Sequence, residues 1–363
     1  MRILMLIPHA RVRGPMGRII ELLNDGLRDL GCEVETVPWG RHTDDEGLVR
    51  KLIGRFQDGL GVRRMLSVSQ PDCVIVQTSH DGRAIVRDLV LVRTIGRHAP
   101  PIVLEFHGSR IDLLSSPGHH ALKRATLLLL RAVEGALLLS SEELDCFRAI
   151  APQTRFEVVS NPFEPLAGTG TRDGGELRTE ASPARLLFAA RLFEEKGVFD
   201  VLDAVEMLLE RRRAHLVVAG AGSAESELAR RIAARDLGSH VTLTGYLPPA
   251  SLAREYAEAD VFVFPTYYRG EGFPTVIAEA MGAGLPIVTT RTRGITDHLR
   301  DGINALFVPA RDPEAVAEAV ERLLTDEQLR ERMAKANIES VQAFAPDRVA
   351  RAYLEALHRV LDG

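Results

Sequence analysis

Short apolar runs alternate with amphipathic stretches along the first part of the chain. Residues 3–7 form an apolar run, and residues 17–30 carry apolar side chains at helical spacing, with Gly31 directly after them. This pattern predicts a buried strand followed by a helix that ends at Gly31. Further strands are predicted at Cys32–Val37, Cys73–Gln77, Ile102–Phe106 and Ala136–Leu139. Because strands that alternate with helices form right-handed βαβ units, we expect a parallel sheet here.

A second series of the same kind follows a stretch, residues 165–183, that has almost nothing to bury. Its strands are predicted at Arg185–Ala190, His215–Ala219, Val241–Thr244, Val261–Phe264, Pro286–Thr289 and Ala305–Val308. A chain of 363 residues exceeds the size at which one core usually keeps growing. We therefore expect two α/β domains, residues 1–164 and 184–345, joined by a linker. Helical spacing continues in Pro313–Leu324 and over 346–361, and we expect the last helix, about 346–363, to pack back on the first domain.

The motif that indicates ligand binding most clearly spans residues 270–281. It comes soon after the predicted strand Val261–Phe264 and Pro265. Gly270 and Gly272 let the backbone approach a ligand closely. Pro274 suits the first turn of a helix, where its missing N–H costs nothing. The amides at the start of that helix would face an anion, such as a diphosphate.

Charged residues in two places complete this pattern. Glu271 and Glu279 lie eight residues apart, so they can reach different hydroxyl groups of one elongated ligand, and ionised carboxylates accept such donors well. Arg191 and Lys196 follow the predicted strand at the start of the second domain. Two cations at the carboxyl end of a strand can neutralise a pyrophosphate.

With these residues the second half resembles the family-four retaining glycosyltransferases, whose fold is GT-B: two doubly wound Rossmann-like domains that face a cleft. Glu271 and Glu279 match the two glutamates of that family, and Arg191 and Lys196 match its paired basic residues. The resemblance is almost continuous from Arg185 to about Val320 and looser in the first half. Glycine turns of the family are matched by Gly220-Ala221-Gly222, Gly245-Tyr246-Leu247 and Gly284-Leu285-Pro286.

The resemblance implies roles for individual residues of the second domain. Glu279 should bind the ribose and Glu271 a hydroxyl of the donor sugar, while Tyr246 lies where the family contacts the base. Backbone groups for the sugar and diphosphate should come from the segment that follows Glu271, namely Gly272, Phe273, Pro274 and Thr275.

Two positions of the first half also match family turns. His107, in Glu105-Phe106-His107-Gly108, is expected to touch the donor sugar near the reacting carbon. Gly14 and Gly17 correspond to a glycine loop beside the donor phosphates, although Pro15 and Met16 separate them, which departs from the commoner paired form.

The resemblance therefore implies a hexosyltransferase that moves a sugar from a UDP- or GDP-sugar to a glycan or lipid-linked acceptor, in cell-surface polysaccharide or glycolipid synthesis. The resemblance also implies transfer with retention of configuration. No metal or other cofactor is expected, because Arg191 and Lys196 would stabilise the leaving group. His119-His120 lacks a carboxylate partner at metal-ligand spacing. Two alternatives stay open: a nucleotide-sugar 2-epimerase of the same fold, and a non-catalytic nucleotide-sugar-binding partner.

Composition and charge restrict the partners and the location that we expect for the protein. Up to Phe163 the chain carries 21 basic and 19 acidic residues, so that part is net +2 and the rest −7, within a total of −5. This balance argues against nucleic acid as a partner. Three widely spaced cysteines are typical of a reducing, cytoplasmic location. The basic first part and the run Leu127–Leu130 leave peripheral contact with the inner face of a membrane open, beside the simpler interpretation as a solvated surface and a buried helix.

Overall fold

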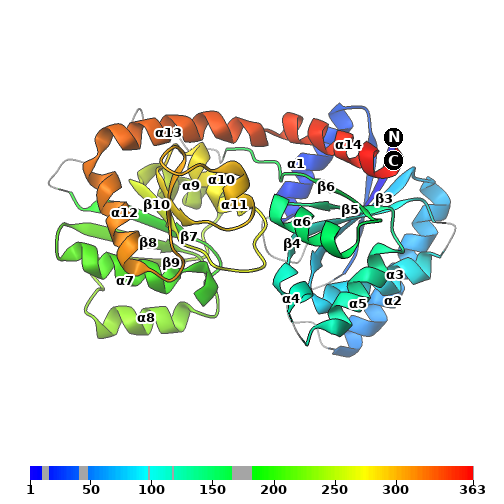
Figure 1. Cartoon of the computed structure of the whole chain (residues 1–363), viewed down its shortest axis with the longest axis horizontal. Helices are drawn as coiled ribbons and strands as arrows, with labels where there is room; N and C mark the ends of the chain where they lie inside the picture. The colour runs from blue at the N-terminus through cyan, green and yellow to red at the C-terminus, as the bar shows by residue number, and fades with distance from the viewer. Residues whose placement is uncertain (10–15, 41–47, 97–98, 117, 166–181, 363) are drawn as a thin grey trace. The chain divides into compact units, whose positions relative to one another are not determined.

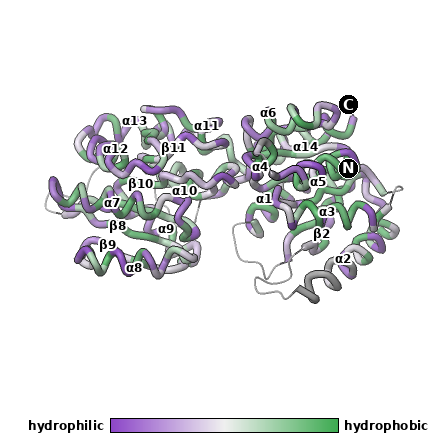
Figure 2. Tube along the Cα trace, turned by 60° about the horizontal axis from the view of Figure 1, so that its bottom comes forward, coloured by the Kyte–Doolittle hydropathy of each residue, from purple (hydrophilic) through white to green (hydrophobic). Residues whose placement is uncertain are grey.

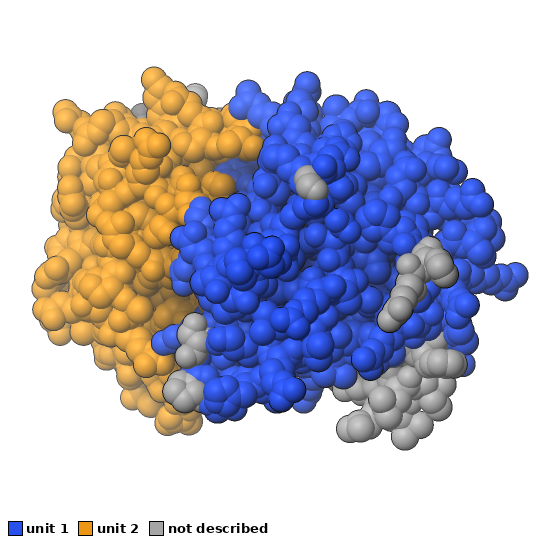
Figure 3. All heavy atoms as spheres, turned by 45° about the vertical axis from the view of Figure 1, so that its right-hand side comes forward, with its two compact units in different colours: residues 1–162, 269–273, 344–363 blue, residues 163–268, 274–343 orange. Residues whose placement is uncertain are grey.

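A computed structural model describes the chain except for residues 10–15, 41–47, 97–98, 117, 166–181 and 363. The described residues form two compact units (Figure 3). The first unit holds Met1–Pro162, Arg269–Phe273 and Phe344–Gly363, and the second holds Phe163–Tyr268 and Pro274–Ala343. Most of the predicted linker lies outside the described residues. No described helix has both the length and the apolar character needed to cross a membrane.

The first unit is built on a parallel sheet of described strands in the order β2-β1-β3-β4-β5-β6 (Figure 1). Its strands are β1 (Arg2–Ile7), β2 (Glu33–Pro38), β3 (Cys73–His80), β4 (Ile102–Ser109), β5 (Gly135–Leu138) and β6 (Arg155–Val158). Its helices are α1 (Met16–Asp29), α2 (Leu48–Ser69), α3 (Gly82–Ile95), α4 (Ile111–Ser115), α5 (His120–Leu130), α6 (Ser141–Ile150) and α14 (Pro346–Asp362).

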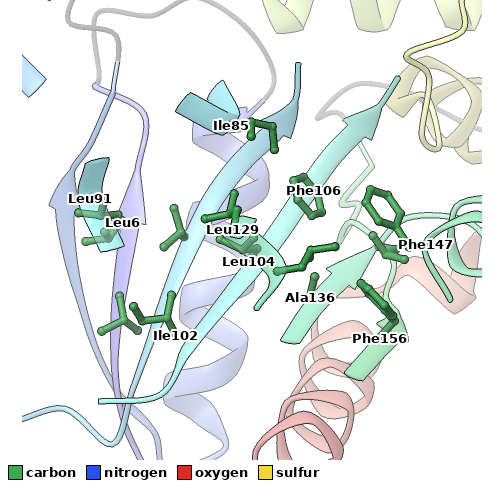
Figure 4. Close-up of a cluster of buried hydrophobic side chains, with 14 of the residues drawn as sticks. Leu6, Ile85, Leu91, Ile102, Leu104, Phe106, Leu129, Ala136, Phe147 and Phe156 are labelled. Atoms are coloured by element: carbon green, nitrogen blue, oxygen red, sulfur yellow. The ribbon is translucent and has the colours of Figure 1, made fainter. Parts of the chain in front are cut away.

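The apolar side chains of these strands point alternately to the two faces of the sheet, as strand geometry requires. On one face Leu104 and Phe106 of β4 join a core with side chains of α2, α3, α5 and α6 (Figure 4). On the other face Val103 of β4 joins Tyr353 and Leu357 of α14 in a core that also includes α1. Because its helices cover both faces, the sheet is buried and its central strands are continuous apolar runs.

The second unit repeats this plan with a sheet in the order β12-β11-β10-β7-β8-β9. Its strands are β7 (Ala184–Ala189), β8 (Ala214–Ala219), β9 (Val241–Gly245), β10 (Val261–Phe264), β11 (Ile287–Thr290) and β12 (Ala305–Val308). The helices are α7 (Val198–Leu209), α8 (Glu225–Ala234), α9 (Pro249–Glu258), α10 (Thr275–Gly282), α11 (Gly294–His298), α12 (Pro313–Thr325) and α13 (Glu327–Val341), and Glu194–Lys196 forms a single 3₁₀ turn.

One strand of the first sheet was missed from the sequence. Arg155–Val158 alternates polar and apolar side chains and forms the edge strand β6, which pairs with β5. Half of its side chains are polar, so it lacks the continuous apolar run that identified the central strands.

Candidate functional site

The second sheet reverses the direction of its strand order between β7 and β10, which are hydrogen-bonded neighbours. Successive strands are added on one side from β7 to β9 and on the other from β10 to β12. In open α/β sheets, ligands bind beyond the carboxyl ends of the strands at such a switch point. The loops that leave β7 and β10 carry residues 190–197 and 265–274, which include the predicted motifs.

Backbone contacts join these two loops. The amide of Tyr267 donates to the carbonyl of Glu195 at 2.8 Å, and the hydroxyl of Thr266 donates to the same carbonyl at 3.3 Å. Gly197 has φ 83°, and a Cβ at this position would lie 2.5 Å from the carbonyl oxygen of Pro265. Only glycine fits such a contact at such a dihedral, so Gly197 fixes how closely the loops approach.

Lys196, on the loop that follows β7, is 7% exposed and lies among aromatic rings. Its Nζ lies 5.1 Å from the centroid of the Tyr268 ring, and the rings of Phe193 and Phe264 follow at 5.6 and 5.5 Å. Arg191 is exposed, with its guanidinium 5.3 Å from the centroid of the same Phe193 ring. The two predicted cations therefore lie near one ring at the carboxyl end of β7, and the limited water around buried Lys196 strengthens its attraction for an anion.

Glu279 is half-buried on α10, with one carboxylate oxygen held in place. The hydroxyl of Tyr256, a buried residue of α9, donates to its Oε2 at 2.8 Å. Burial raises the pKa of the Glu279 carboxyl, and the hydrogen bond from Tyr256 acts in the opposite direction. A carboxylate fixed in this way has further lone pairs with which it can accept hydroxyl donors.

Helix α10 begins one residue later than predicted. Pro274 is its N-cap residue, with an extended backbone and no side-chain capping hydrogen bond, and Thr275 opens the first turn. Amides of a first turn have no partner within the helix, and they favour anions. Tyr246 follows the turn at Gly245, which has φ 66°, and its side chain is 75% exposed.

One boundary of the sequence analysis is corrected by the structure, because residues 269–273 group with the first unit. A Cβ at Gly108, which has φ 112°, would lie 2.3 Å from the carbonyl oxygen of Gly270. A Cβ at Gly272 would lie 2.9 Å from the side chain of Leu139. Residues 269–273, predicted to belong to the donor domain, pack in the first unit because Gly108 lets the backbone of Gly270 approach and Gly272 leaves room for the side chain of Leu139.

Glu271 is half-buried in this segment, in the same unit as His107. Phe273 is 5% exposed, and its ring stacks on Phe344 with centroids 4.8 Å apart and an interplanar angle of 12°. Its side chain therefore belongs to the core, which leaves only backbone groups for a ligand. Gly17 is exposed in the first turn of α1.

The predicted site residues thus divide between the units. The second unit holds Arg191, Lys196, Tyr246, Pro274, Thr275 and Glu279, and the first holds Gly17, His107, Glu271, Gly272 and Phe273. Gly14 lies outside the described residues. No group of three or more His, Cys, Asp or Glu in the described part of the chain is placed to hold a metal ion.

Sequence reasoning missed the residues that support the charged ones, namely Phe193, Tyr256, Phe264 and Tyr268. Phe264 and Tyr256 were visible only as apolar positions of a strand and a helix. The turn Gly220-Ala221-Gly222, which matches a glycine turn of the family, has a packing reason for its glycines. A Cβ at Gly220 would lie 1.8 Å from the carbonyl oxygen of Ala190, and one at Gly222 would lie 2.2 Å from that of Leu192.

Comparison with known proteins decides the family of the second unit. Residues 175–340 match the model of the glycosyl transferases group 1. This segment is a group 1 glycosyl transferase domain. An alpha-D-kanosaminyltransferase of Streptomyces kanamyceticus is 37% identical to the chain over 152 residues, which cover 41% of this chain and 39% of that protein. The amylovoran biosynthesis glycosyltransferase AmsK of Erwinia amylovora is 32% identical over 146 residues, 39% of this chain and 36% of that protein. The chain thus spans less than half of the length of either relative.

Solved structures extend the likeness from the group 1 domain to the whole chain. A sucrose-phosphate synthase from Thermosynechococcus elongatus has a TM-score of 0.78 at 18% identity and covers 99% of both chains. Anabaena Alr3699/HepE in complex with UDP-glucose has a TM-score of 0.74 at 17% identity, over 99% of this chain and 100% of that one. The chain therefore has the GT-B fold, with two parallel-sheet, Rossmann-like domains.

Proposed function

We propose that this chain transfers a hexose-type sugar from a UDP- or GDP-sugar to a glycan or lipid-linked acceptor, with retention of configuration and without a metal. The observation that carries the proposal is the pair of cations, Arg191 and Lys196, around the Phe193 ring at the switch point of the group 1 domain. The UDP-glucose in the complex of the structurally similar HepE supports a donor of this class.

The chemistry of the leaving group gives these cations their role. Departure of a nucleoside diphosphate builds negative charge on its phosphate, and fixed cations stabilise that charge more in the transition state than in the bound donor. Arg191 and Lys196, with the amides that open α10, would supply this stabilisation. Glu279, held by Tyr256, would bind the ribose and so place the diphosphate.

Residues of the first unit would act on the sugar. We assign Glu271 to a hydroxyl of the donor sugar and His107 to a contact near the reacting carbon. In a transfer with retention, the leaving phosphate would take the proton of the acceptor hydroxyl on the face from which it departs. The bond between the anomeric carbon of the sugar and the phosphate oxygen breaks, the diphosphate leaves with that oxygen, and the acceptor oxygen forms the new bond to the same carbon.

A panel of nucleotides and nucleotide sugars tests the proposal by thermal shift. Binding to the folded state at about 100 times the dissociation constant should raise the melting temperature by roughly 5 °C. We expect this rise with either the uridine or the guanosine series, and a smaller one in the Glu279→Gln variant. Equal melting temperatures with every compound would remove the proposed function.

Product analysis with the best-binding donor then separates the alternatives. Transfer requires an acceptor, whereas a 2-epimerase would convert the donor without one. A non-catalytic partner would bind nucleoside diphosphate but show neither transfer nor slow hydrolysis of the donor. We expect slow hydrolysis alone, and faster consumption of donor when glycan or lipid acceptors are added.

We also propose that the first unit attaches to the cytoplasmic face of an anionic membrane, which would bring a lipid-linked acceptor near. Its neighbouring helices α2, α3 and α5 mix apolar and polar residues along their described length (Figure 2). They carry large apolar side chains that are at least 43% exposed, namely Leu60, Val68, Val86, Val90 and Leu128. Exposed basic residues lie on the same helices, among them Arg63, Arg64, Arg93 and Arg124. Apolar side chains beside basic ones are typical of peripheral binding to anionic lipid.

Vesicle flotation tests this attachment. The protein should float with vesicles that contain phosphatidylglycerol and remain behind with pure phosphatidylcholine. The double variant Arg93→Glu and Arg124→Glu should lose flotation, while Arg230→Glu, an exposed charge change on α8 of the other unit, should not. Equal behaviour of the wild type with both kinds of vesicle would contradict the attachment.

A further inference from the structure

A chain of buried polar side chains crosses the apolar core between the first sheet and α14. Ile75 of β3 and Val103 of β4 belong to this core, so Gln77 and Glu105, two residues further along each strand, point to the same face. Gln77 and Glu105 are register partners and are 4% and 2% exposed. Polar groups at this depth lose water, and they must find partners within the protein.

Glu105 is the centre of this chain. Its Oε2 accepts a hydrogen bond from Nε2 of Gln77 at 2.7 Å and another from the hydroxyl of Tyr353. Tyr353 lies on α14 and is 1% exposed. Burial raises the pKa of its hydroxyl well above the usual value, as does the neighbouring Glu105 charge, so the hydroxyl keeps its proton and donates. The carboxylate is thereby tied to the last helix of the unit.

The other end of the chain reaches His107. Its Nε2 contacts Oε1 of Gln77 and lies 3.5 Å from Oε1 of Glu105. Nε2 of Gln77 already donates to the carboxylate, so the atom that Gln77 presents to the ring is its carbonyl oxygen, which can only accept. The proton of the neutral imidazole must therefore be on Nε2, which leaves Nδ1 as an acceptor.

The remaining ring atom of His107 agrees with this assignment. Nδ1 is buried and has no hydrogen-bond partner among the described residues. Burial lowers the pKa of the His107 ring, while the Glu105 charge acts in the opposite direction. The neutral ring is thus favoured, and its one unpaired lone pair is on Nδ1.

We propose that Glu105 and Tyr353 are positioning residues that hold His107 with its proton on Nε2, so that Nδ1 accepts a hydrogen bond from a hydroxyl of the donor sugar. The identity of this ligand rests on the proposed function, whereas the tautomer does not. Glu105 accepts a hydrogen bond from Nε2 of Gln77 and so fixes the orientation of that amide. The amide oxygen of Gln77 then fixes the tautomer of the His107 ring, and the Tyr353 hydroxyl on α14 holds the carboxylate of Glu105. A helix distant in sequence thereby sets which atom of His107 a ligand meets.

Nuclear magnetic resonance of protein labelled with ¹⁵N in its histidine rings tests the proposal without any substrate. The signals of His107 are identified by their loss in His107→Gln. In the wild type near neutral pH we expect the Nε2–H tautomer. Glu105→Gln removes the carboxylate that fixes the amide of Gln77. Both tautomers of His107 should then be populated, and the ¹⁵N chemical shifts of its two ring nitrogens should move toward each other. Tyr353→Phe, which removes a single oxygen, should move them the same way by a smaller amount.

Val360→Ala provides the matched control. Val360 lies in the same core and on the same helix as Tyr353, fully buried and outside the polar chain. Its truncation should lower the melting temperature but leave the ring signals as in the wild type. A purely structural role of Tyr353 would predict no change in the ring signals with either variant of α14.

Kinetics with the proposed donor gives the second readout. Loss of one directed hydrogen bond should lower kcat about tenfold in Glu105→Gln, with a smaller change in KM. Unchanged ring signals in both Glu105→Gln and Tyr353→Phe, or a wild-type ring protonated on Nδ1, would overturn the proposal. Shifted ring signals in a protein that turns over no nucleotide sugar would uphold the positioning and remove the proposed function instead.

Discussion

Turnover with the proposed donor is expected to fall at least about 100-fold when Lys196 is replaced by methionine. The methionine keeps an unbranched apolar stem against Phe193, Phe264 and Tyr268, and it removes the charge. A cation surrounded by aromatic rings and 7% exposed acts through little water, so its loss should raise the barrier for departure of the diphosphate. Steady-state kcat at saturating donor measures the effect.

Two controls separate charge from folding. Arg230→Met removes an exposed cation of α8 that pairs with Glu227, and it should leave kcat near the wild-type value. Thermal unfolding should show that Lys196→Met is folded. A kcat within threefold of the wild type in a folded Lys196→Met protein would remove the assigned role. Turnover that survives excess chelator is expected as well, and a loss restored by manganese would contradict the metal-free mechanism.

The architecture could be predicted because both sheets are buried on both faces. Their central strands are continuous apolar runs, and every strand predicted from such a run is present, from β1 to β12, with ends shifted by up to three residues. The edge strand Arg155–Val158 was missed because its polar side chains face solvent in part. Burial of both faces made the parallel, doubly wound order predictable, whereas the short polar edge strand β6 had too few apolar positions to be detected.

Candidate site residues could be chosen from the sequence where they are neighbours along the chain. Arg191 and Lys196 lie on one loop, and Glu279 follows Pro274 on one helix. Their supporting residues come from distant segments, so no local pattern marks them. In the sequence, Tyr353 occupies one of the apolar positions of an amphipathic helix. Only the folded structure shows that its hydroxyl contacts Glu105. The grouping of residues 269–273 with the first unit was hidden for the same reason.

Nucleotide affinity is expected to fall about tenfold, and the stability of the folded protein to rise, when Glu279 is replaced by glutamine. The variant keeps an oxygen for the Tyr256 hydroxyl but loses the charge that strengthens hydrogen bonds from ribose hydroxyls. The pKa of Glu279 is raised above its usual value of 4.5 by burial. A group with a raised pKa favours folding below its unfolded pKa, and this advantage is lost as the pH rises through the folded value.

The sign of the pH effect therefore distinguishes this carboxylate from one that stabilises the fold. The free energy of unfolding of Glu279→Gln, relative to the wild type, should increase from pH 4.5 upward. Calorimetric titration with nucleoside diphosphate measures the affinity, and Tyr256→Phe, which removes the hydroxyl that holds Oε2, should weaken it by a smaller factor. If Glu279→Gln is less stable than the wild type at neutral pH, the charge of Glu279 is compensated within the protein. The carboxylate would then have a structural role. A stabilised variant with weakened nucleotide binding would instead show a charge kept at the expense of stability because the ligand requires it.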